Sequence, residues 1–85
     1  MPFVVQQEEQ KIIIEDENSQ VAKELRAPVT KEQIISTAIE IAKQVGFSKF
    51  ILKTSDGDVW EDPTDVPDNI NKSLHIYIVA VNKGA

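Results

Sequence analysis

Six carboxylates crowd the stretch SDGDVWEDPTDVPD, residues 55–68, which is the part of the chain most suggestive of chemistry. Carboxylate oxygens are the ligands that Ca²⁺ takes in proteins. Four of these residues are therefore weak candidate metal ligands: Asp56, Asp58, Glu61 and Asp62. The spacing does not fit an EF-hand loop, because Gly57 stands between the first two acids. We favour a solvated turn whose charges keep an edge strand from pairing with other molecules, and we expect no metal.

Other residues that could carry chemistry are sparse. His75 is the only histidine, and the chain contains no cysteine. One histidine cannot build a histidine-rich metal site, and a chain without cysteine has no disulfide, thiolate zinc site or cysteine nucleophile. No serine-nucleophile motif is present, and the three glycines are isolated rather than gathered in a phosphate-binding loop. The sequence therefore predicts a protein that is not an enzyme, with no catalytic residue and no cofactor.

The composition narrows the possible partners. The nine Lys and Arg are scattered among fourteen Asp and Glu, for a net charge of −5, whereas nucleic-acid binding depends on clustered positive charge. The apolar runs are much shorter than the roughly 20 residues that span a membrane, and the N-terminus lacks the pattern of a signal peptide. We expect a cytoplasmic protein, a monomer or weak homodimer, that binds a protein partner and neither nucleic acid nor membrane.

The first third of the chain predicts a tail and two strands. Residues 1–9 are interpreted as an N-terminal tail, and residues 10–85 as one domain. KIIIED, residues 11–16, is predicted to be a strand because three adjacent β-branched isoleucines suit a sheet. Residues 21–27 alternate weakly and are favoured as a second strand. The alternative is a short helix capped by Ser19, although Pro28 would leave it little length.

The clearest predicted element is a helix that follows Thr30. Thr30 and Gln33 have the spacing of a capping box. Gly46 comes after the last apolar residue of the helix, where a left-handed C-cap needs no Cβ. The apolar residues recur at helical spacing and form one stripe: Ile34, Ile35, Ala38, Ile41, Ala42 and Val45.

The second half of the chain predicts three more strands. FSKFILK, residues 47–53, is interpreted as a strand, and Asp56-Gly57 predicts a two-residue hairpin turn with positive φ at both positions. DVWED supplies a short edge strand, and residues 63–70 an irregular loop with one short 3₁₀ turn. SLHIYIVAV is a last strand long enough to be central. The sequence thus predicts an α+β fold, a mixed sheet of four to five strands packed on one helix.

This collinear order over residues 10–85 resembles the β-grasp roll of ubiquitin-like proteins, with the element order ββαβ(β)β. The resemblance is carried by the opening strand pair, the capped helix with its following Gly46, KFIL before an acidic turn, and KSLHIYI as the last strand. It implies a single ubiquitin-like domain. Conjugated members and sulfur-carrier relatives end in Gly-Gly, whose carboxylate is adenylated, whereas this chain ends in Gly84 and Ala85. A side chain at the last residue would crowd the narrow channel of activating enzymes.

Strand alternation predicts which residues face away from the helix. If Leu74, Ile76 and Ile78 face inward, the residues between them face outward, and the same reasoning applies to the first and third strands. The outward set consists of Ile13, Ile51, His75, Tyr77 and Val79. The resemblance places three of these, Ile51, His75 and Tyr77, at positions of ubiquitin's hydrophobic recognition patch. Two other interpretations stay open, namely that residues 1–9 cover this face or that the exposure is ordinary scatter.

These observations lead to one expected function and two alternatives. We expect a non-enzymatic ubiquitin-like interaction module, of unassigned pathway, that binds a protein partner through the open sheet face. The first alternative is a ubiquitin-like modifier or sulfur carrier that acts through the tail residues Gly84 and Ala85. The second alternative is an acidic protein that binds Ca²⁺ through residues 55–68.

Overall fold

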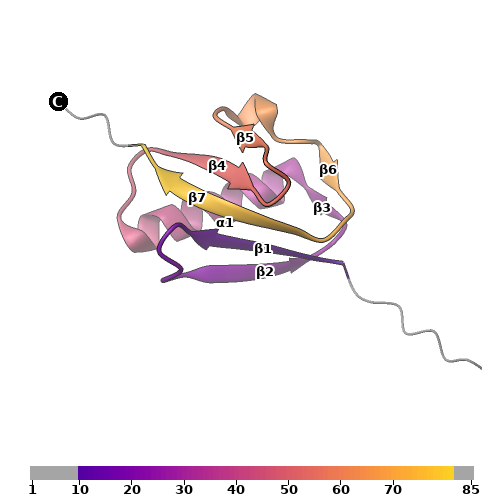
Figure 1. Cartoon of the computed structure of the whole chain (residues 1–85), viewed down its shortest axis with the longest axis horizontal. Helices are drawn as coiled ribbons and strands as arrows, with labels where there is room; N and C mark the ends of the chain where they lie inside the picture. Colours follow the sequence, from indigo (N-terminus) through magenta and orange to yellow (C-terminus); the bar gives the residue numbers. More distant parts are fainter. Residues whose placement is uncertain (1–9, 82–85) are drawn as a thin grey trace, which may run out of the picture.

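The computed structural model describes residues 10–81, which form two layers, a sheet and a helix (Figure 1). The five-stranded mixed sheet has the order β2-β1-β7-β4-β5, and a two-stranded sheet pairs β3 with β6. The elements are β1 (Lys11–Asp16), β2 (Ala22–Arg26), β3 (Val29–Thr30), α1 (Lys31–Val45), β4 (Phe50–Thr54), β5 (Val59–Trp60), η1 (Pro63–Asp65), β6 (Asn69–Ile70) and β7 (Leu74–Ala80). The α+β class and the five-strand sheet on one helix agree with the prediction.

The last strand is central, as its length predicts. β7 pairs in parallel with β1 and antiparallel with β4, while β2 and β5 lie at the two edges. Neighbouring parallel strands need a long crossover, and here α1, β4 and β5 lie within it. Residues 21–27 contain the strand β2, so the alternative of a short helix in this segment was wrong.

The core lies between the sheet and α1. Alternation turns one row of each central strand toward the helix, and these residues are buried as predicted. Six isoleucines with 0% exposure form the centre of this core: Ile12, Ile14, Ile34, Ile41, Ile76 and Ile78. Burying a large aliphatic side chain contributes about 1.5–3 kcal/mol, so this layer supplies much of the stability of the fold.

The predicted caps of α1 are confirmed. The Thr30 hydroxyl accepts a hydrogen bond from the Gln33 N–H, and the Gln33 side chain accepts one from the Thr30 N–H at 2.8 Å. Gly46 adopts φ 85° and ends the helix. The predicted stripe faces the core, but Thr37 is also buried and was not predicted. Within residues 10–81, no helix has both the length and the apolar content that crossing a bilayer requires.

Two predicted details were wrong. β4 begins at Phe50 rather than at Phe47, because Phe47 follows the helix cap and packs against the core instead of pairing in the sheet. The hairpin after β4 has a three-residue loop, in which only Gly57 has positive φ (94°). The Gly57 N–H donates to the Thr54 carbonyl and the Thr54 N–H to the Asp58 carbonyl. This pattern is a turn followed by a left-handed glycine, the usual form of a three-residue loop.

The pairing of β3 with β6 was also not predicted. Val29 lies opposite Ile70, and both side chains are buried in the core. The loop of residues 63–70 does contain the expected 3₁₀ turn, η1, but its last two residues form β6. This small sheet attaches the loop to the start of α1.

Asp16 is a buried carboxylate at the end of β1, with 0% exposure. Its Oδ1 accepts a hydrogen bond from the Val21 N–H at 2.7 Å, and its Oδ2 accepts one from the Asn18 N–H at 3.0 Å. Burial raises the pKa of Asp16, but the backbone N–H groups of Val21 and Asn18 outweigh it, so the pKa lies below its ordinary value. The turn from β1 to β2 therefore depends on an ionised carboxylate.

Replacing Asp16 with Asn should lower the free energy of unfolding by about 1–3 kcal/mol near neutral pH, because an amide NH₂ would then face a backbone N–H. Since the folded-state pKa lies below the ordinary value of 3.8, the wild-type advantage is present above that pH and is lost as the pH falls through the folded-state pKa. Urea denaturation at a series of pH values, from neutral down through the acid range below 3.8, measures both effects.

The exposed Asp58 provides the matched control. Asp58→Asn should change the free energy of unfolding by less than about 0.5 kcal/mol. Equal losses in the two variants would contradict the structural role of Asp16.

Candidate functional site

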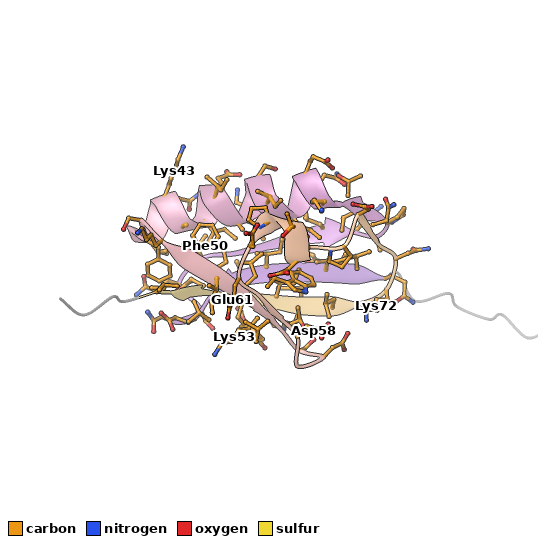
Figure 2. All side chains as sticks on the ribbon, turned by 90° about the horizontal axis from the view of Figure 1, so that it is seen from above. Lys43, Phe50, Lys53, Asp58, Glu61 and Lys72 are labelled. Atoms are coloured by element: carbon orange, nitrogen blue, oxygen red, sulfur yellow. The ribbon has the colours of Figure 1, made fainter. Side chains whose placement is uncertain are left out.

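The sheet face turned away from α1 carries a row of apolar and aromatic side chains. Lys53 on β4 projects from this side of the molecule, whereas Lys43 on α1 projects from the opposite side (Figure 2). The five residues predicted to face outward all lie here and are half-buried, and we call them the open-face patch: Ile13, Ile51, His75, Tyr77 and Val79. Their buried neighbours in the strands point the other way, into the core.

Strand pairing brings the open-face patch together from three strands. Ile13 of β1 lies opposite His75 of β7, and Ile51 of β4 lies opposite Val79 of β7. Tyr77 lies between His75 and Val79 in the same outward row. Neighbouring strands are about 4.7–4.9 Å apart, so directly opposite side chains are within contact range. The open-face patch is therefore continuous across β1, β7 and β4.

His75 is held within this surface by two neighbours. Its ring stacks on that of Tyr77, with the centroids 4.5 Å apart and the planes 11° from parallel. Its Nε2 lies 2.7 Å from Glu15 Oε1, and Glu15 is the residue of β1 opposite Tyr77. The approach is close but is not aligned as a hydrogen bond, and Nε2 has no hydrogen-bond partner within residues 10–81. The contact is a charge pair when the imidazole is protonated, and the two rings form a flat element of the surface.

Lys53 and Val59 form a rim along the β4–β5 side of the open-face patch. Lys53 of β4 lies opposite Tyr77 of β7 on one side and opposite Val59 of β5 on the other. The side chain of Val59 is exposed, at 46%. Lys53 forms no ion pair within residues 10–81. Neither residue was predicted from the sequence. The available signal was strand alternation, because Lys53 follows Ile51 by two positions, and Val59 lies on the antiparallel strand next to it.

Three carboxylates of the acidic stretch, residues 55–68, make local hydrogen bonds. Asp56 accepts a hydrogen bond from Lys72 Nζ at 2.5 Å and raises the pKa of Lys72 above its ordinary value. Asp62 accepts a hydrogen bond from the Thr64 N–H at 3.0 Å and caps η1, while Asp65 accepts from the Asp62 N–H at 3.2 Å. Residues 10–81 contain no group of three or more His, Asp or Glu side chains arranged to hold a metal ion. The weak candidate ligands Asp56, Asp58, Glu61 and Asp62 are not brought together.

Two predictions concern residues outside the described range. The candidate tail residues Gly84 and Ala85 follow the last described residue, Val81. Residues 1–9, the proposed tail and possible cover of the open sheet face, precede Gln10. Both therefore remain predictions from the sequence.

A second surface was not predicted from the sequence. A groove of about 270 Å³ lies between α1 and the edge formed by β4 and β5, and we call it the edge groove. Ile39 contributes to its helix wall and is 41% exposed. The available signal was the spacing of Ile39 four residues after Ile35, which places both on one side of the helix.

Comparison with protein-family models, with curated proteins and with solved structures finds no match to this chain.

The adjacent residues Ile13 and Ile14 provide a matched test of which sheet face is open. Ile14→Ala should lower the free energy of unfolding by about 2–5 kcal/mol, because it leaves a cavity in a fully buried site. Ile13→Ala should cost less than about 1.5 kcal/mol, because only cross-strand contacts are lost. Urea denaturation measures both, and equal losses would show that the sheet face of Ile13 is covered.

Proposed function

We propose that this protein is a non-enzymatic protein-interaction module with a ubiquitin-like β-grasp fold, and that the open-face patch is its partner-binding site. The fold assignment is supported by the strand order β2-β1-β7-β4-β5, with the first and last strands parallel at the centre and a capped helix in the crossover. This order fits the ββαβ(β)β arrangement on which the resemblance rests.

The single observation that carries the proposed function is the continuity of the open-face patch. Five half-buried side chains from three strands form one apolar and aromatic surface. Contiguous apolar patches with polar rims on small proteins mark interaction sites more often than isolated exposed residues do. Aromatic residues such as Tyr77 supply a large contact area with few rotatable bonds, which lowers the entropic cost of binding.

The rim indicates the chemistry of the partner. Lys53 lies beside Tyr77 and has no ionic partner within residues 10–81, so it can pair with a carboxylate on the partner. The partner surface that fits is an apolar stripe with an acidic residue at one side. Of the two alternatives, the modifier role depends on Gly84 and Ala85, which lie outside the described residues. The calcium role has no assembled ligand set within residues 10–81.

Replacing Ile51 or Tyr77 with Asp should remove partner binding without unfolding the protein, because each change puts a charge into an apolar contact surface that is not part of the core. The full chain, immobilised as wild type and as each variant, is used to capture proteins from lysate, and captured proteins are identified by mass spectrometry. The identified partner should bind both variants at least roughly tenfold more weakly. Thermal unfolding checks that each variant is folded.

Lys43→Asp, on the far side of the helix, is the control and should leave capture unchanged. Titration of the purified partner into the isotope-labelled chain should shift the amide signals of Ile51, Tyr77 and Val79. Capture that survives both Asp substitutions would overturn the proposed site.

Reversing the charge of Lys53 tests the expected acidic residue on the partner. Lys53→Glu should slow association and weaken binding, and the effect should shrink as the salt concentration rises because exposed charges are screened. Association rates measured at low and high ionic strength give the comparison. An unchanged rate at low salt would show that the partner places no carboxylate near Lys53.

A further inference from the structure

The edge groove is a gap in the packing between the helix and the sheet. α1 forms one wall, and β4 with β5 forms the other. The volume of about 270 Å³ is slightly below the roughly 300–1,000 Å³ of typical small-molecule sites, so it suits one or two side chains of a peptide. The apolar lining includes Ile35, Ala38, Ile39, Phe50, Leu52 and Trp60.

The helix wall of this groove carries an exposed isoleucine, Ile39. Ile39 and Val59 are the exposed large apolar residues within residues 10–81, and Ile39 is the one that lines the groove. Ile39 makes no part of the buried core, whereas Ile35 one turn earlier packs against it. Ile39 shares the groove lining with the half-buried Ile35 and Phe50, so the three form one contiguous apolar surface, the kind of surface that marks contact sites.

The sheet edge at this groove lacks a neighbouring strand. β5 pairs Trp60 with Leu52, and the same register would place Asp62 opposite Phe50. The chain instead turns at Asp62, which caps η1 (Pro63–Asp65), so no residue of β5 reaches Phe50. The first residue of β4 therefore lies at an edge that β5 does not cover.

The hydrogen-bond pattern indicates where the backbone of Phe50 points. The Val81 N–H donates to the Lys49 carbonyl, and the Ser55 N–H donates to the His75 carbonyl. The backbone N–H and C=O groups of the odd-numbered residues of β4 thus point toward β7. In an antiparallel pair these directions alternate, so the backbone groups of the even-numbered residues point toward the β5 edge. The N–H and C=O of Phe50 face that edge, where an extended peptide can pair with them.

The charges at the groove have one sign. Glu61 and Asp62 are the charged residues in its lining, and both are acidic. Glu61 forms no ion pair within residues 10–81. One oxygen of Asp62 accepts the Thr64 N–H. The groove therefore favours a positive charge next to an apolar group.

We propose that the edge groove binds an extended peptide segment of a protein partner. One large apolar side chain of the peptide enters between Ile39 and Trp60, a Lys or Arg lies beside Glu61, and the peptide backbone pairs with Phe50. Such strand addition draws affinity from backbone hydrogen bonds and specificity from alternate side chains. This surface differs from the open-face patch, although Ile51 borders both, and the proposal does not rest on the proposed function.

A random seven-residue peptide library displayed on phage, selected on the immobilised full chain, tests the proposal. Selection on the wild type should enrich peptides with a large apolar residue and a Lys or Arg within two positions of it. Synthetic versions of these peptides should bind Ile39→Glu roughly tenfold or more weakly, because the apolar contact is replaced by a charge. Selection on Glu61→Lys should shift the preference to Asp or Glu. Both substituted residues are exposed, so the variants should remain folded.

Tyr77→Ser separates this proposal from the proposed function, because it alters the open-face patch and should leave peptide binding intact. Enriched peptides whose binding is lost with Tyr77→Ser and not with Ile39→Glu would place the site on the open face and overturn the groove proposal. No enrichment above that seen on Ile39→Glu would also overturn it. A concentration-dependent dimer that Ile39→Glu abolishes would assign the groove to a second copy of the chain and would likewise overturn it.

Discussion

The parallel pairing of β1 with β7 is the constraint on which the rest of the structure depends. It places the first and last strands of the described residues side by side at the centre of the sheet. Their inward rows, Ile12 and Ile14 on β1 and Ile76 and Ile78 on β7, are completely buried and form the floor on which α1 packs. Parallel neighbours cannot be joined by a short turn and need a long connection. In the chain, the helix and all the other strands belong to this connection between β1 and β7.

The two candidate surfaces follow from this arrangement. One helix covers one face of a five-stranded sheet, so the outward rows of the same central strands remain as the open-face patch. β5 has only two residues and does not cover the whole edge of β4, which leaves the edge groove beside α1. The core and the open-face patch therefore use alternate residues of the same strands, such as Ile14 and Ile13, whereas the edge groove is lined by core residues such as Leu52 and Trp60.

Much of the fold could be predicted from the sequence because its signals are local. Thr30 and Gly46 mark the ends of the helix through their own side-chain and backbone chemistry, and strand alternation separates inward from outward residues. The pairing of β3 with β6 could not be predicted, because two-residue strands carry no periodicity. The edge groove depends on where β5 stops relative to β4, and Ile39 alone gave no sign of that register. The open-face residues were placed correctly on their face, while their role in binding is a proposal.

Solvent access to the methyl groups of the sheet tests the central claim, that one face of the sheet is covered and the other is open. The measurement is the NMR relaxation enhancement that a soluble, uncharged gadolinium chelate produces at each isoleucine methyl group of the full chain. The structure predicts strong enhancement at Ile13 and Ile51 and weak enhancement at Ile14 and Ile76. Equal protection of Ile13 and Ile14 would contradict it, because the open-face patch would then be covered within the protein itself.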